Sequence, residues 1–305
     1  MRRILKILFW ALAPAAAASC VEDFTPDIKE ADIRTVVVDA LITTEAEAHC
    51  VKLSASAPYG TPSKDIPAIS GARVTLSDGR REVLLEEEEG TGCYYTPADY
   101  AAEEGRTYTL SIEGEDRGEA FRLEAEDTMP PCGVRADSFD YYKLTDSLWV
   151  FAVWGQDLPG IASHYAADLR VNGKSHGFGQ WVSIDGYQMF DGNYLNGGEY
   201  LFYSAFEGLR DGGEETLPLK EGDEVDLYFY SMSDFFYTFM TAMLSESIAH
   251  LPLFSPQPAN LPTNIRGGAA GVFALAHVTR MRLVIGNPER TRLEMLADHG
   301  MLPGF

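Results

Sequence analysis

Basic residues are scarce in this chain, which carries 24 Lys and Arg against 46 Asp and Glu and has a formal net charge of −22. The charge is spread along the sequence, apart from a short acidic run at residues 86–89, which we interpret as a solvated turn or strand end. Proteins that bind nucleic acid neutralise its phosphates with clustered Lys and Arg. The composition therefore argues against nucleic acid as a partner.

The sequence also lacks the common catalytic and cofactor motifs, since it contains no G-x-S-x-G, H-E-x-x-H, P-loop or C-x-x-C pattern. The six histidines are scattered, and no two lie within four residues of each other. Gly267, Gly268 and Gly271 form a cluster without the preceding strand, following helix and lysine of a phosphate-binding loop. We interpret them as positions where the backbone turns and passes close to a neighbouring strand. We therefore predict no catalytic residue, no metal site and no cofactor.

Cysteine is rare, and the first of the four cysteines directly follows a sorting signal. Residues 1–19 start with basic side chains and end in small ones, the pattern of a secretory signal peptide. The apolar stretch between them, of about twelve residues, is too short to cross a hydrocarbon core of ~30 Å. Cys20 stands where a lipobox places its cysteine, although Ala17 replaces the usual leucine. We predict cleavage before Cys20 and acylation of Cys20, for example with palmitate. An ordinary signal peptide is the alternative.

The residues after Cys20 indicate where such an anchored protein is located. Glu22 and Asp23 form an acidic pair that resembles the signal by which some Gram-negative lipoproteins reach the cell surface. Residues 20–34 are polar and show no periodicity, so we interpret them as an acylated tether. We predict a protein that is lipid-anchored in the outer membrane and faces the cell exterior.

Three cysteines remain if Cys20 is acylated: Cys50, Cys93 and Cys132. Cys50 and Cys93 both lie in strand-like stretches, and we predict a disulfide between them. Three reduced, buried thiols are the alternative.

Short strand-like segments separated by Gly, Pro and Asp follow the tether, and Asp78-Gly79 predicts a hairpin turn between two of them. We therefore predict an Ig-like β-sandwich over residues 35–128. The spacing of Gly and Tyr between Gly90 and Leu110 resembles that of prealbumin-like and carboxypeptidase-regulatory-like sandwich domains. The predicted strands are 35–42, 50–55, 72–76, 82–87, 93–96, 107–112 and 120–126.

A Pro-rich linker is predicted at residues 129–136, and a second β-rich domain at residues 137–305. The period changes once in this second part, because apolar residues three and four apart predict an amphipathic helix over 234–249, with Ser233 as its N-cap. Its many aromatic residues favour core packing, with a partner-binding patch as the alternative. A short helix is predicted at 290–297, and the predicted strands are 138–142, 148–154, 165–171, 181–185, 187–190, 200–205, 224–231 and 281–285.

One loop in the second part has the side chains of a ligand site. Asp185, Asp191, Asn193 and Tyr194 offer oxygen ligands for calcium, or an aromatic ring and amides for a sugar. Ordinary turn chemistry is the alternative explanation.

A different grouping would suit a hydrolase. If the side chains of Asp157, His164, Asp185 and Asp191 met in one pocket, they would form an unfamiliar hydrolytic site.

Several of these motifs together resemble a family of envelope lipoproteins that carries a domain of unknown function. Its genes commonly lie next to those of TonB-dependent outer-membrane transporters. The most specific matching motif runs from Asn264-Ile265 through Gly267-Gly268 to Gly271 and Phe273. Further matches are at 36–38, 71–74, 105–110 and 129–130.

The resemblance implies a two-part, mostly β protein that acts near a transporter, and it brings no catalytic residues. We predict a non-catalytic accessory or binding lipoprotein. A structural or adhesive envelope protein and an envelope hydrolase are the alternatives.

Overall fold

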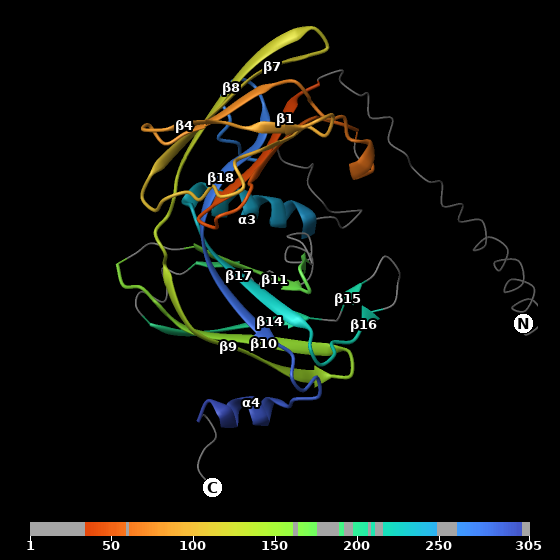
Figure 1. Cartoon of the computed structure of the whole chain (residues 1–305), viewed down its shortest axis with the longest axis vertical. Coiled ribbons are helices and arrows are strands. Elements are labelled where there is room, and N and C mark those ends of the chain that lie inside the picture. The colour runs from red at the N-terminus through yellow and green to blue at the C-terminus, as the bar shows by residue number, and fades with distance from the viewer. Residues whose placement is uncertain are drawn as a thin grey trace, which may run out of the picture. The chain divides into compact units, whose positions relative to one another are not determined.

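The structure is a computed structural model that describes residues 34–58, 61–160, 164–175, 189–191, 198–206, 209–210, 216–248 and 261–300. Residues Arg34–Phe305 form one compact unit, distinct from Met1–Ile33. The unit is mainly β (Figure 1), which confirms the predicted fold class. Within the described residues, no helix is long and apolar enough to span a bilayer.

A nine-stranded sheet, here called the large sheet, takes strands from both halves of the sequence. Strand β13, Met189–Asp191, pairs with β11 beside the main path. The main path is β12 (Lys174–Ser175), β11 (His164–Val171), β17 (Glu224–Met232), β18 (Ala270–Val284), β1 (Val36–Thr43), β2 (Cys50–Ala55), β6 (Cys93–Tyr95) and β5 (Glu86–Glu88).

Two smaller sheets are packed against the large sheet through apolar cores. The first contains, in order, β4 (Glu82–Leu84), β3 (Arg73–Ser77), β7 (Thr107–Asp116) and β8 (Glu119–Thr128). The second contains β14 (Glu199–Phe206), β10 (Leu148–Asp157) and β9 (Val134–Thr145). The remaining elements are the hairpin β15 (Leu209–Arg210) and β16 (Thr216–Leu217), the short 3-10 turn Ser63–Asp65, and helices α3 (Asp234–Ile248) and α4 (Arg292–Asp298).

The first core lies between the first small sheet and strands β1, β2, β6 and β18, so the N-terminal half is a β-sandwich. The second core joins the second small sheet to β11 and β17 and extends to helix α3. The first core includes Val38, Leu53, Val74, Leu110, Ile112, Leu123 and Phe273. The second includes Trp149, Phe151, Tyr165, Leu227, Phe229, Phe236 and Val272.

Strand β18 connects the two halves, because it pairs in parallel with β1 and antiparallel with β17 (Figure 1). Residues 129–133 link β8 to β9, where the linker is predicted. The two-domain division stays a prediction. Strands from both predicted domains belong to the large sheet.

Several local predictions are confirmed. Asp78 Oδ1 accepts hydrogen bonds from the backbone N–H groups of Arg80 (2.9 Å) and Arg81 (2.7 Å) in the hairpin between β3 and β4. These bonds lower the pKa of Asp78 to about 2. Ser233 Oγ accepts from the N–H of Phe236 at 3.2 Å, as expected of a helix N-cap. The predicted short C-terminal helix is α4, where Thr291 and Glu294 form a capping box.

The predicted last strand, 281–285, is wrong in extent, because β18 begins at Ala270. Residues 272–276 are buried on both faces of the strand, so they show no alternation of apolar and polar residues. Asn264 fixes the start of this strand, since its side-chain amide donates to the carbonyl of Phe273 (2.7 Å) and accepts from the N–H of Phe273 (3.1 Å).

The glycines of this motif allow close backbone contacts, as predicted. A Cβ at Gly271 would lie 1.9 Å from the carbonyl oxygen of Val38, and one at Gly267 would lie 2.3 Å from that of Arg122. Both glycines also have positive φ angles, +100° and +108°, which other residues adopt only with strain. The motif therefore brings β18 close to β1 at Gly271 and brings the segment before β18 close to β8 at Gly267.

Candidate functional site: an apolar cavity beside helix α3

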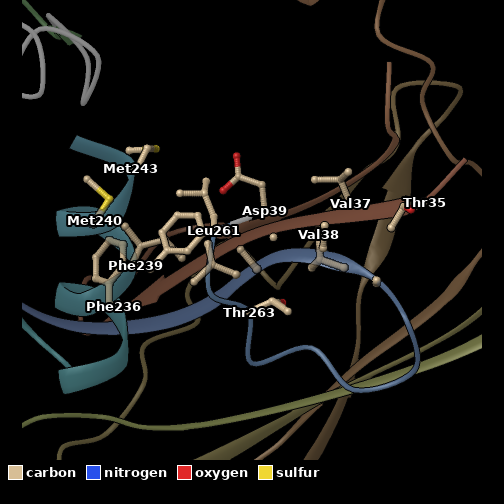
Figure 2. Close-up of a pocket in the computed structure, with 16 residues that line it drawn as sticks. Thr35, Val37, Val38, Asp39, Phe236, Phe239, Met240, Met243, Leu261 and Thr263 are labelled. Atoms are coloured by element: carbon tan, nitrogen blue, oxygen red, sulfur yellow. The ribbon is translucent and has the colours of Figure 1, made fainter. Parts of the chain in front are cut away.

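A cavity of about 860 Å³ lies between helix α3, strands β1 and β18, and the segment that precedes β18 (Figure 2). Strand alternation builds one wall, since Val38, Ala40 and Ile42 of β1 belong to the first core and the residues between them point to the opposite face. The lining residues are Thr35, Val37, Val38, Asp39, Ala40, Leu41, Phe236, Phe239, Met240, Met243, Leu261, Thr263, Ala269, Ala270, Gly271 and Val272.

Helix α3 forms the other wall. Phe236, Phe239 and Met240 are buried and belong to the second core, and with Met243 they line the helix side of the cavity (Figure 2). The core-packing interpretation of the aromatic helix is therefore confirmed for these side chains, and the same residues also border the cavity. Methionine side chains are flexible and polarizable, so they adapt to ligands of irregular shape.

Among the residues that the structure describes, Asp39 is the only ionisable one that lines the cavity. Its side chain is solvent-exposed at the cavity wall, yet protein atoms crowd around it and raise its pKa above the usual value. Lys52, its cross-strand neighbour on β2, acts in the opposite direction. The cavity is thus apolar with a single carboxyl group at one side.

The size and lining match those of small-molecule sites, which are typically ~300–1,000 Å³, mostly apolar and supplied with few polar groups. Sequence patterns could not reveal this cavity, because β1, α3 and β18 come together only in the fold. The available signal was the run of small residues at 269–271 opposite the Phe and Met side chains of α3.

The predicted calcium or sugar site stays a prediction. Asp185, Asn193 and Tyr194 lie outside the described residues, as do Cys20, Glu22 and Asp23. Asp191 ends β13, where its backbone is paired with that of His164 in β11.

Two residues of the hydrolase grouping, Asp157 and His164, contact different partners. The carboxylate of Asp157 accepts a hydrogen bond from the hydroxyl of Tyr165, whereas the ring of His164 stacks on Tyr237 of α3 with centroids 4.0 Å apart. Neighbouring residues of a strand point to opposite faces, so His164 and Tyr165 direct these contacts to opposite sides of the large sheet. Among the described residues, no group of three or more His, Cys, Asp and Glu side chains is arranged to hold a metal ion.

Cys50 and Cys93 lie on adjacent strands, β2 and β6, as half-buried free thiols. Burial and a hydrogen bond with Cys93 raise the pKa of Cys50 to about 12. The disulfide between them stays a prediction, and their positions on paired strands bring the two residues close to each other.

The chain matches one known protein family. Residues 21–282 match the family described as "Domain of unknown function (DUF4249)". The chain belongs to the DUF4249 family. No protein with a curated description matches it.

Two solved structures are similar to parts of the DUF4249 chain. One is a DUF4785 family protein from Legionella pneumophila, with 11% sequence identity and a TM-score of 0.24, and the match covers 66% of this chain and 51% of that one. The chain thus spans about half the length of the Legionella protein. The other is a candidate carbohydrate-binding protein from Bacteroides uniformis, with 11% identity and a TM-score of 0.22, and the match covers 81% of this chain and 98% of that one.

Proposed function

We propose that this DUF4249 protein is a non-catalytic binding lipoprotein of the bacterial envelope, and that it holds an amphipathic small molecule in the cavity beside α3. The observation that carries the proposal is the apolar lining of a cavity of about 860 Å³ with one carboxyl group, that of Asp39. Burying an apolar ligand surface contributes roughly 25 cal/mol per Å² before the costs of binding are subtracted.

The ligand chemistry follows from the charges at the cavity. An apolar chain or ring system fits against Phe236, Phe239 and Val272, and an ammonium or other hydrogen-bond donor fits beside Asp39. A carboxylate in the same place would be repelled by Asp39 and by the net charge of −22 of the chain. The proposed ligand is therefore apolar with a cationic end.

The proposed location depends on the sequence. Acylation of Cys20, a tether over 20–34 and the acidic pair Glu22 and Asp23 would hold the protein on the outer face of the outer membrane. The family resemblance supports a TonB-dependent transporter as its partner and a prealbumin-like N-terminal sandwich. A structural or adhesive role is the alternative to ligand binding, and it would differ from the proposed role in the partner that the protein contacts.

A displacement assay tests the binding function. The purified chain is saturated with an apolar fluorescent probe, N-phenyl-1-naphthylamine, which is then displaced by dodecylamine or by dodecanoate, two competitors of equal chain length. We expect saturable probe binding, and displacement at a lower concentration by the amine. Absence of saturable binding, or stronger displacement by the carboxylate, would contradict the proposal.

The assay also has a defined pH dependence. A raised pKa means that Asp39 takes up a proton at a higher pH than an ordinary aspartate does. As the pH falls through this pKa, the carboxyl group becomes neutral, so the advantage of dodecylamine over dodecanoate should shrink. The Asp39→Asn variant should show the reduced advantage at every pH.

A separate measurement tests the anchor. In detergent phase separation of cell extracts, the wild-type protein should enter the detergent phase and the Cys20→Ser variant the aqueous phase, because the acyl chains supply the membrane affinity. An equal distribution of the two proteins would refute the anchor and leave the cavity proposal standing.

A further inference from the structure

Cys132 lies where the link between β8 and β9 passes strand β18. Its backbone N–H donates to Glu104 Oε1 at 3.2 Å, and its thiol donates to the carbonyl oxygen of Val134 at 3.0 Å. The sulfur also lies 3.7 Å from the hydroxyl oxygen of Thr279 on β18. The thiol is half-buried and is held in place from three directions.

His277 belongs to the same cluster as Cys132 and Glu104. It lies two residues before Thr279 on β18, so the two side chains share one face of the strand. Its Nε2 is 2.9 Å from Glu104 Oε1. Its imidazole interacts with the thiol of Cys132, and its Nδ1 is buried without a hydrogen-bond partner. One carboxylate therefore contacts both the imidazole and the backbone N–H of the cysteine.

The electrostatics of this cluster favour a charged pair. The interaction with His277 lowers the pKa of Cys132 below its usual value, against the effect of burial. Burial opposes the charge on His277, but Cys132 and Glu104 raise the pKa of the imidazole above its usual value. Glu45, in the loop after β1, acts on His277 in the same direction.

In the protein with its thiols reduced, Cys50 offers an internal comparison, since both cysteines are half-buried. The neighbour of Cys50 is another thiol, and its pKa is raised to about 12. A difference in reactivity between Cys50 and Cys132 would therefore report thiolate formation rather than exposure alone.

We propose that Cys132, with His277 and Glu104 as positioning residues, is a covalent modification site that exchanges with low-molecular-weight disulfides. The Cys132 thiolate attacks one sulfur of the disulfide R–S–S–R, a bond forms between Cys132 and that sulfur, and the original S–S bond breaks. The bonding electrons leave with the released thiolate, which takes the proton held by His277. Cys132 is thereby oxidised to a mixed disulfide, and the other half of the disulfide is reduced to R–SH.

Residue-resolved labelling of the full chain tests the proposal. The folded protein is treated with bis(2-hydroxyethyl) disulfide, a neutral reagent, across a range of pH, and each cysteine is quantified in its own peptide by mass spectrometry. At pH 7 Cys132 should react at least about tenfold faster than Cys50, because one unit of pKa changes the thiolate fraction tenfold. The midpoint of its pH profile should also lie lower.

The variants separate a positioned thiol from a merely accessible one. His277→Gln should slow Cys132 about tenfold at pH 7 and move its pH midpoint upward, while the rate at Cys50 stays unchanged. Glu104→Gln, at a side chain that is 47% exposed, should produce a smaller shift of the same sign and serves if His277→Gln does not fold. Equal rates at Cys132 and Cys50 in the wild-type protein, or an unshifted pH midpoint in the folded variants, would overturn the proposal.

Discussion

Neighbouring residues of strand β18 have different surroundings, because their side chains point to opposite faces of the large sheet. Phe273 and Leu275 are fully buried in the first core, whereas Val272 borders the cavity beside α3. The side chains of Phe273 and Leu275 are large, whereas those of Ala270 and Val272 at the cavity are smaller. One face of the strand therefore packs into the first core, whereas the other packs into the second core and also borders the cavity.

The comparison also explains why β18 lies at the centre of the molecule. Its partner β1 alternates in the same way, with Val38 and Ala40 in the first core and Asp39 at the cavity. The two strands are parallel and in register, so the core-facing and cavity-facing rows of side chains run side by side. The cavity wall is thus fixed by the same pairing that closes the first core.

The largest effect is expected on the core-facing side. Phe273→Ala removes a fully buried ring from the first core, which costs about 3–5 kcal/mol of unfolding free energy. The melting temperature should fall by roughly 10 °C, as measured by circular dichroism. A shift of only a degree or two would show that this face does not hold the sandwich together.

A smaller effect is expected one residue earlier. Val272→Ala removes two methyl groups from a side chain that borders empty space on one side, so we expect a loss of about 1 kcal/mol. The two variants change adjacent residues of one strand, which makes each the control for the other. If Val272→Ala lowered the melting temperature as much as Phe273→Ala, the contrast between the two faces would be lost.

The sequence was most informative where local rules decide the structure. Asp78-Gly79 predicts its hairpin and Ser233 its helix cap because both act on backbone groups a few residues away. The close contact at Gly271 is also predictable, since only glycine tolerates such a backbone approach. The period-two strands of the N-terminal sandwich follow from one buried and one exposed face.

Long-range features could not be predicted. The start of β18 carries no alternation, because both of its faces are buried. The cavity depends on the pairing of Val37 with Ala270, residues far apart in the chain. The contact of Cys132 with His277 and Glu104 likewise joins three segments that are distant in the sequence, so no sequence spacing predicts it.

The most direct test of the binding account fills the cavity without touching the cores. Ala270 is half-buried and lines the cavity, and Ala120, exposed on β8, supplies a matched control. Ala270→Trp should weaken binding of N-phenyl-1-naphthylamine at least about tenfold, since a ring in the cavity competes with the ligand for the same apolar surface, whereas Ala120→Trp should bind like the wild-type protein. Melting temperatures show whether both variants are folded. Undiminished probe binding by folded Ala270→Trp would contradict the assignment of this cavity as the binding site.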